Sequence, residues 1–168
     1  PAILWAKQNN ERVVISTNTI NLQDQLIAKD IPLLREVMGV DFQAAVVKGR
    51  GNYLCPRRLA TMRRRLPTTV DEMRVFAKVL IWLLESATGD RSEISLRGAS
   101  EIGAWLRLSA EDDGCTLDRC HTQLDDTCPF YKARRAAEAA HILIVNHALL
   151  LADVAVGSRV LPDYKYLI

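Results

Sequence analysis

The sequence predicts an α/β protein in which a parallel-sheet domain is interrupted by a mostly helical insertion. Two short runs rich in β-branched or small apolar residues, 12–16 and 42–47, flank a stretch with helical spacing. Strand, helix, strand in this order is typical of a parallel sheet. A third apolar run at 142–145 resumes the pattern, whereas residues 48–128 contain no convincing strand. We therefore expect one sheet domain built from both ends of the chain.

The first part of the sheet domain, residues 1–47, begins with an apolar helix over 3–8, followed by a polar turn and the first strand. The segment 17–19, Thr-Asn-Thr, has the composition of a loop and helix cap. Pro32 lies in the first turn of a later helix, and Gly39 ends that helix before the second strand.

The insertion, residues 48–128, is expected to be mostly helical. Thr69 and Glu72 form a capping box that opens one helix, and 100–108 forms a shorter one. Polar loops rich in aspartate occupy 109–127. The first of these helices has an apolar stripe that predicts its buried face, made of Met73, Phe76, Leu80, Leu83, Leu84 and Ala87.

Residues 129–168 return to the sheet domain. Pro129 begins a helix that runs through Ala140, and 142–145 forms a buried strand. Residues 164–168 begin one more strand.

The composition is that of a globular protein. Apolar residues make up 49% of the chain and charged residues 25%, which excludes wholesale disorder. The net charge of +2 is small, so nucleic-acid binding has to be judged from how charge is distributed. No stretch reaches the ~18 apolar residues of a membrane span, and we do not expect residues 1–7 to be a signal peptide, because they have neither a basic n-region nor a small-residue cleavage site. We expect a cytoplasmic protein without a membrane partner, cut from a longer chain because it lacks an initiator Met.

Four cysteines lie within the insertion or at its end: Cys55, Cys115, Cys120 and Cys128. In a cytoplasmic setting such a set indicates metal ligands more than disulfides. They are separated by 59, four and seven residues, which is wider than the paired spacing of structural zinc sites and suits an iron–sulphur cluster. The proline after Cys128 turns the chain away, as in many cluster sites. A zinc site, or free or disulfide-bonded cysteines, remain alternatives, and His121 is a further candidate ligand.

A basic segment surrounds the first cysteine. Residues 48–65 contain no acidic residue and seven basic ones: Lys48, Arg50, Arg57, Arg58, Arg63, Arg64 and Arg65. Beside Tyr53, this run suits phosphate contact with a base stacked nearby, which predicts single-stranded DNA binding by Lys48, Tyr53, Arg57 and Arg58. The alternative is a solvated helix face on which Arg57 and Arg58 offset the negative charge of a cluster.

Polar residues also follow two strands of the predicted sheet. Thr17 and Thr19 lie where the first strand meets a helix, the edge at which open α/β sheets bind ligands. Their hydroxyls are candidates for holding a nucleic-acid backbone, and simple helix capping is the alternative. Asn146 and His147 occupy the equivalent place after the third strand. For His147 a capping or packing role is weighed against that of a catalytic base.

Four segments resemble the DinG/XPD family of iron–sulphur DNA helicases, within superfamily two. Residues 13–26 (VVISTNTINLQDQL) are similar to its motif Ia, and residues 48–55 (KGRGNYLC) to the stretch that carries the first cluster cysteine. Residues 128–140 and 144–150 (IVNHALL) are similar to the stretch from the fourth cysteine to the strand before the DEAH box. The bacterial DinG-like branch fits best.

The resemblance implies a partial RecA-like motor lobe with an inserted cluster domain. It implies a four-iron, four-sulphur cluster on the four cysteines, single-stranded DNA beside it, and 5′ to 3′ unwinding by the full protein. The DNA contacts of motif Ia would fall on Thr17 and Thr19.

The chain departs from the family in lacking both nucleotide motifs, the Gly-x-x-x-x-Gly-Lys-Ser/Thr loop and the Asp-Glu-Ala-His box. We therefore expect ATP and magnesium to be used only by a longer parent protein, with the remaining motor lobe as partner. The fragment alone is not expected to be an enzyme. An electron-transfer subunit with a cluster and a zinc-stabilised interaction module are the competing interpretations.

Overall fold

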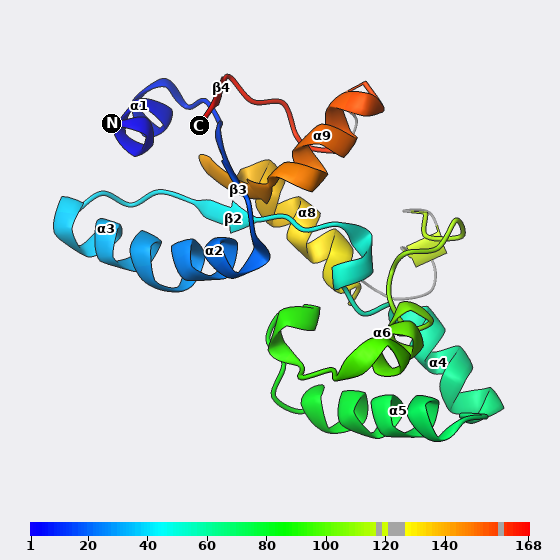
Figure 1. Ribbon diagram of the computed structural model, residues 1–168. Coiled ribbons are helices and arrows are strands. Elements are labelled where there is room, and N and C mark those ends of the chain that lie inside the picture. Colours follow the sequence, from blue (N-terminus) through cyan, green and yellow to red (C-terminus); the bar gives the residue numbers. More distant parts are fainter. Residues whose placement is uncertain (117–118, 121–126, 158–159) are drawn as a thin grey trace. The chain divides into compact units, whose positions relative to one another are not determined.

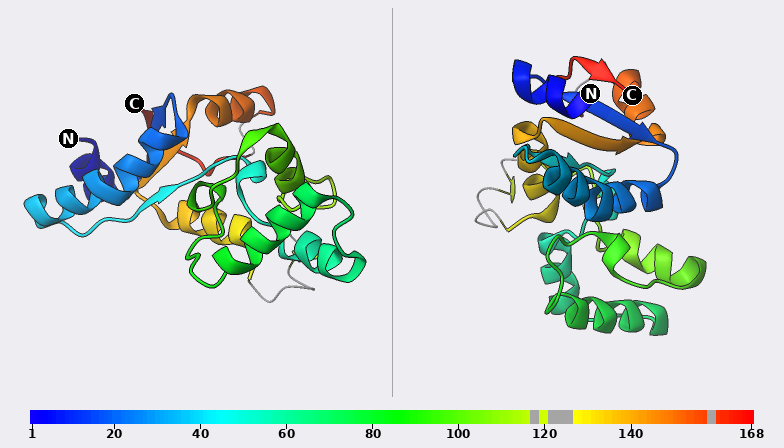
Figure 2. Two further views of the ribbon diagram at one scale, coloured as in Figure 1. Left: turned by 60° about the horizontal axis from the view of Figure 1, so that its bottom comes forward. Right: turned by 90° about the vertical axis from the view of Figure 1, so that its left-hand side faces the viewer.

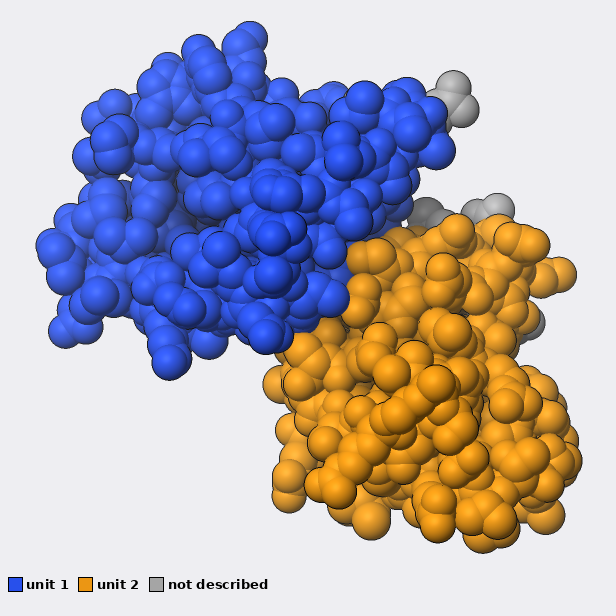
Figure 3. All heavy atoms as spheres, in the orientation of Figure 1, with its two compact units in different colours: residues 1–48, 133–168 blue, residues 49–132 orange. Residues whose placement is uncertain are grey.

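The computed structural model describes residues 1–116, 119–120, 127–157 and 160–168. The chain forms two compact units, coloured separately in Figure 3. The first unit contains residues 1–48 and 133–168, and the second contains residues 49–132. That the first is a motor lobe and the second a cluster domain stays a prediction.

The first unit is built on a four-stranded parallel sheet with the strand order β2-β3-β1-β4 (Figure 1). Its strands are β1 Val13–Thr17, β2 Ala44–Val46, β3 Ile142–Asn146 and β4 Tyr166–Leu167. The strand from the far end of the chain, β3, lies between β1 and β2, with Val13 opposite Ile142 and Thr17 opposite Asn146. This confirms the predicted α/β class, and the all-parallel sheet is consistent with part of a RecA-like lobe.

Helices cover both faces of this sheet, as the views in Figure 2 show. Those of the first unit are α1 Ala2–Asn9, α2 Ile20–Gln25, α3 Ile31–Met38 and α9 His147–Ala155; a π-helical turn, Leu26–Asp30, joins α2 to α3, and α8 Pro129–Ala139 leads into this unit. Alternate strand residues point to opposite faces. Val14, Leu143 and Val145 pack with α8 and α9, whereas Val13 and Ile142 pack with α1 and α3. Parallel strands buried on both sides explain the continuous apolar run of β3.

Helix boundaries in the first unit follow local capping rules. The Thr19 hydroxyl accepts a hydrogen bond from the Leu22 amide at the start of α2, and Gly39 ends α3 in a left-handed conformation with φ 60°. The Asn146 side chain accepts a hydrogen bond from the Leu149 amide at the start of α9. Asn146 is therefore the N-cap of α9.

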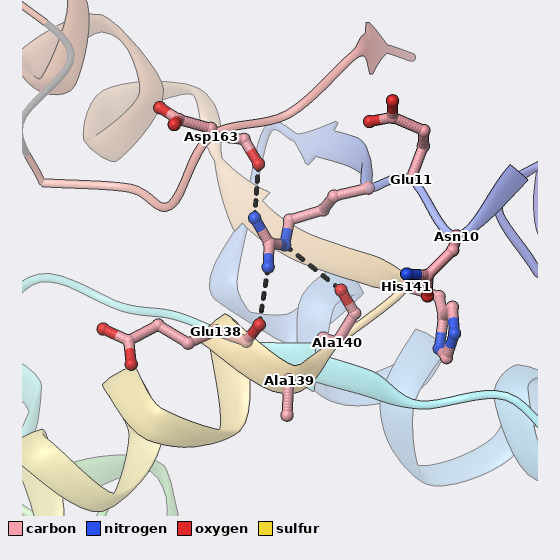
Figure 4. A pocket seen from close by; sticks show the side chains of 8 residues that line it. Asn10, Glu11, Glu138, Ala139, Ala140, His141 and Asp163 are labelled. Carbon is pink, nitrogen blue, oxygen red and sulfur yellow. Dashed lines mark hydrogen bonds between the residues drawn. The ribbon is translucent and has the colours of Figure 1, made fainter.

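The first unit also contains a polar pocket of about 230 Å³ beside β1 and the end of α8 (Figure 4). The Arg12 side chain lines this pocket, and its guanidinium donates hydrogen bonds to the carbonyl oxygens of Glu138 at 2.6 Å, Ala140 at 3.1 Å and Asp163. The guanidinium thus binds carbonyls at the C-terminal end of a helix. Its role is to hold α8 against the sheet.

The second unit is mostly helical. Its helices are α4 Pro56–Arg65, α5 Val70–Trp82 and α6 Gly98–Leu106, with 3₁₀ turns at η2 Arg50–Asn52 and η3 Arg91–Glu93. Their core is a cluster of buried residues: Leu54, Leu59, Met62, Val75, Val79, Ala104, Trp105 and Leu108. Trp105 is its largest member, and its indole N–H donates to the Gly51 carbonyl at 2.8 Å. None of the described helices in either unit is both long and apolar enough to cross a lipid bilayer.

The buried face of α5 differs from the prediction. Thr69 caps the helix as expected, but the helix buries Glu72, Val75 and Val79, while Met73 is 59% and Leu84 84% exposed. The stripe was misassigned because α5 is apolar on most sides, so spacing alone does not single out one face.

A buried carboxylate decides the orientation of α5. Glu72 accepts hydrogen bonds from the Thr68 amide (2.8 Å) and hydroxyl (2.9 Å), and it pairs with Arg65 (3.2 Å) and Arg107 (2.9 Å). These hydrogen bonds, with contributions from both arginines, lower the pKa of Glu72 from 4.5 to about 2. The charge is buried because it is paired and hydrogen-bonded, which sequence spacing does not reveal.

Candidate metal centre

All four cysteines are free thiols and lie in the second unit. Cys55 is the N-cap of α4 and 1% exposed, and Cys128, directly before α8, is 3% exposed. Cys120 is buried and Cys115 half-buried. The alternative ligand His121 lies outside the described residues. The structure thus shields three of the four sulphur atoms from water.

Two of the four thiols, Cys115 and Cys120, have raised pKa values. Burial raises the pKa of Cys115, and the neighbouring Cys128 and Cys55 raise it further. Burial likewise raises the pKa of Cys120 to about 12, with further contributions from Cys128, Cys115 and Cys55. Because thiolate is the ligand form, metal binding here would release protons.

The donor set fits a sulphur-ligated metal group. Four thiolates complete either a zinc site or an iron–sulphur cluster. Burial keeps the pKa of Cys115 raised, and the charges of Arg50 and Arg57 oppose part of that rise. Within the described parts of the chain, no three His, Cys, Asp or Glu side chains are arranged to hold one metal ion together. The chemistry of the four donors suits a metal, whereas their described arrangement forms no closed coordination set, so the metal site stays a prediction.

Backbone hydrogen bonds fix the position of Cys55. The segment 53–55 lies between two others, forming isolated antiparallel bridges that pair Tyr53 with Asp90 and Leu54 with Ser109. The Cys55 amide donates to the carbonyl of Leu108 at 2.8 Å. The first cysteine is therefore tied by main-chain contacts to the loop that leads to the second.

Two arginines of α4 hold the loop that precedes Cys115. The Arg58 guanidinium donates to the carbonyls of Ser109 at 3.0 Å and Glu111 at 3.1 Å, and Arg57 lies 3.4 Å from the Asp112 carboxylate. Asp112 in turn accepts the Gly114 amide at 2.6 Å, one residue before Cys115. This hydrogen bond lowers the pKa of Asp112, and the positive charges of Arg58 and Arg57 lower it further. The chain of contacts orders the approach to the second cysteine.

These positions bear on the DNA contacts expected in the second unit. The Arg57 and Arg58 side chains are 28% and 23% exposed, so part of each still faces solvent. Tyr53 is only 3% exposed, and its ring packs against Phe130 with the centroids 5.8 Å apart. Base stacking on Tyr53 would require this contact to open. The DNA contacts of all three residues stay predictions.

The other three predicted DNA contacts lie in the first unit. Thr19 is exposed, whereas Thr17 is 4% exposed and its hydroxyl donates to the Thr19 carbonyl at 3.1 Å. Lys48 is 2% exposed, and its ammonium group lies 2.7 Å from the carboxylate of Asp24. Thr17 and Lys48 are thus buried and engaged within the unit, whereas Thr19 is exposed. These three contacts also stay predictions.

Sequence reasoning missed two pairs at the carboxyl edge of the sheet. The Ser16 hydroxyl lies 2.6 Å from Nδ1 of His147, and Asp24 pairs with Lys48. The first pair follows from the parallel register of β1 and β3, because Thr17 lies opposite Asn146, which places their neighbours together. His147 thus contacts Ser16 at the carboxyl edge of the sheet, and its role as a catalytic base stays untested.

Comparison with known proteins identifies relatives of the chain. No protein-family model matches it. The chain is 32% identical to the "3'-5' exonuclease DinG" of Bacillus subtilis over 97% of its length and 17% of that protein. It is 32% identical to the "ATP-dependent DNA helicase DinG" of Salmonella typhimurium and 31% to that of Escherichia coli K12, over its full length and 25% of each. The chain thus spans a quarter or less of these relatives. The comparison confirms the expected resemblance: along nearly all of its length, the chain is homologous to one segment of DinG-type proteins.

Proposed function

We propose that this chain is the segment of an ATP-dependent 5′ to 3′ DNA helicase that carries its iron–sulphur cluster domain and part of its single-stranded DNA path. One observation carries the proposal: four free thiols, three of them buried, lie in a helical unit of a chain homologous to DinG proteins. Residues 48–128 would form the cluster domain, and residues 1–47 and 129–168 parts of motor lobe 1. Such a protein would act on DNA in the cytoplasm.

In this proposal Cys55, Cys115, Cys120 and Cys128 hold the cluster. When bound, a four-iron, four-sulphur group would supply a cross-link among these four points and a one-electron redox centre. The thiols lose their protons on binding, and the guanidinium groups of Arg50 and Arg57 offset negative charge beside Cys115. The bridges of segment 53–55 hold Cys55 before any metal arrives.

The DNA path is proposed on the exposed members of the six candidate residues. Thr19 would contact a phosphate, with Thr17 and the Lys48–Asp24 pair supporting its loop. In the second unit, the solvent-facing parts of Arg57 and Arg58 would attract phosphate. Tyr53 would stack on a base only if its ring contact with Phe130 opened. ATP, magnesium and the remaining motor lobe would be supplied by the longer parent.

The test is to purify the 168-residue chain without oxygen and measure iron, sulphide, zinc and visible absorption. We expect four irons and four sulphides per chain, and their loss in Cys115→Ser. One zinc per chain, without iron, would instead support the zinc-stabilised interaction module. If cluster loss leaves DNA binding and unwinding by the parent unchanged, an electron-transfer role is favoured instead.

A further inference from the structure

Gly89 lies between two cysteine-bearing segments of the second unit. Its carbonyl accepts the amide of Leu54 at 3.0 Å, one residue before Cys55. Its α-carbon faces the ring of Pro129, one residue after Cys128: a Cβ at Gly89 would lie 2.5 Å from the ring Cγ and 2.7 Å from its Cβ. One glycine therefore contacts the neighbours of the first and the fourth cysteine, which are far apart in sequence.

Two features exclude a side chain at Gly89. Its φ of +69° is in the left-handed region, which L-residues rarely adopt. Carbon–carbon contacts normally lie at about 3.5–4.0 Å, so an added Cβ would overlap the ring by about 1 Å. The proline ring is rigid, so the overlap is relieved only by a backbone shift, either at Cys128–Pro129 or in the loop around Gly89.

Hydrogen bonds restrain the loop around Gly89, which limits how far this loop can move away from Pro129. Its amide donates to the Ser86 hydroxyl at 2.9 Å, and the Asp90 amide donates to the Thr88 hydroxyl at 3.1 Å. Both hydroxyls donate to the carboxylate of Glu93. A side chain at position 89 would therefore displace the start of α8 more readily than the loop.

We propose that Gly89 is a positioning residue that sets the separation of Cys55 and Cys128. The proposal rests on the proposed metal centre. Metal–sulphur bonds are about 2.3 Å long and tolerate deviations of about 0.2 Å, so a shift of about 1 Å at one ligand prevents all four from binding together. Without a side chain, Gly89 lets both ligand segments approach the same α-carbon.

The chain offers a matched control for the test. Gly98, the first residue of α6, has the same φ of +69°, and a Cβ added there would have no atom within 4 Å. Gly89→Ala and Gly98→Ala therefore share the backbone strain, and only the first adds the clash. Loss of a residue that orients a metal ligand typically costs ~10–100-fold in affinity. We expect a loss of that size in iron retention under chelator for Gly89→Ala, and retention close to wild type for Gly98→Ala.

A second variant identifies the atom responsible. Pro129→Gly removes the ring, so adding Gly89→Ala to it should lower metal retention no further than Gly98→Ala does. Equal losses in Gly89→Ala and Gly98→Ala would assign the effect to strain and overturn the proposal. Full metal retention in Gly89→Ala would overturn it as well.

A metal-free measurement separates this proposal from the proposed function. Mild oxidation of the metal-free chain forms disulfides among the four cysteines at a rate that depends on their separation, and thiol counting follows it. Slower oxidation in Gly89→Ala than in Gly98→Ala supports the positioning role even if the wild type proves to hold no metal, which would refute only the proposed cluster. Equal oxidation rates would refute the positioning role.

Discussion

Removing the Arg58 side chain should destabilise the loop before Cys115, and with it the proposed metal site, more than it affects DNA binding. The guanidinium donates to the carbonyls of Ser109 and Glu111 and lies 3.8 Å from the Asp112 carboxylate. Hydrogen bonds from charged groups contribute about 1.5–3 kcal/mol when buried. Because the carbonyls of this loop can rehydrate in the variant, we expect Arg58→Ala to lower the free energy of unfolding by about 1–2 kcal/mol.

Arg57 should matter less than its neighbour. It forms an ion pair of 3.4 Å with Asp112, and partly exposed pairs contribute about 0.2–1 kcal/mol. A role in phosphate binding predicts no such difference, since each lost contact would lower the salt slope of single-strand binding by about 0.7. Unequal effects on iron content and stability therefore indicate structural roles, and equal effects on the salt slope indicate DNA contact.

The assay compares Arg57→Ala, Arg58→Ala and the control Arg64→Ala. Arg64 is exposed on the same helix, and its hydrogen bond is to the carbonyl of Ala60 within that helix. Iron per chain and urea unfolding are measured on the 168-residue chain, and the salt dependence of single-strand binding on the parent protein. Full iron and unchanged stability in Arg58→Ala, with a salt slope reduced by about 0.7, would refute the structural reasoning.

Three further predictions concern the missing nucleotide motifs and the second unit. The 168-residue chain should show no ATP hydrolysis above a vector-only control, because both nucleotide motifs are absent from it. Met73→Glu, on the exposed side of α5, should leave urea unfolding nearly unchanged, whereas Val79→Ala in the core should cost about 2 kcal/mol; a reversed order would contradict the observed helix face. The pKa of Glu72 is lowered to about 2, so its contribution to stability is complete above its ordinary 4.5 and is lost as pH falls toward 2; Glu72→Gln should flatten that part of the pH profile in thermal melts.

Features governed by local rules could be predicted from the sequence. Thr19 and Thr69 begin helices because their hydroxyls accept a hydrogen bond from the first turn. Gly39 ends a helix because it has no side chain and adopts the left-handed conformation. The β-branched runs that became β1 and β3 were recognisable because a buried parallel strand is apolar throughout. In each case the signal lies within a few neighbouring residues.

The environment of the candidate site could not be predicted in this way. Lys48 and Arg58 belong to a basic run that suggested an exposed surface, yet their partners Asp24 and the 109–112 loop lie far away in sequence. The sequence shows that a residue is charged but not which residue it pairs with in the fold. Gly89 likewise indicated only a turn, since its contact with Pro129 exists only in the folded chain.

These long-range contacts change what metal binding should contribute to stability. From the sequence, a metal on Cys55 and Cys115 closes a loop of roughly sixty residues, which is entropically costly. In the structure the Leu54–Ser109 bridge already closes most of that loop. Only roughly six residues then separate the bridge from Cys115, and the loop-closure contribution of the metal falls by about 2 kcal/mol.

Loss of metal should therefore loosen the cysteine-bearing segment and leave the helical core folded. In Cys115→Ser we expect limited proteolysis to cut between Ala110 and Cys128, because the bridges at 53–55 and the Trp105 core do not depend on metal. Peptides from α4, α5 and α6 should stay as protected as in the wild type. The cleavage sites are identified by mass spectrometry of the early fragments. Cys55→Ser serves as a comparison, because it removes the proposed ligand at the start of α4. Early cleavage within α5 would show that metal holds the whole unit together and that the backbone bridges do not suffice.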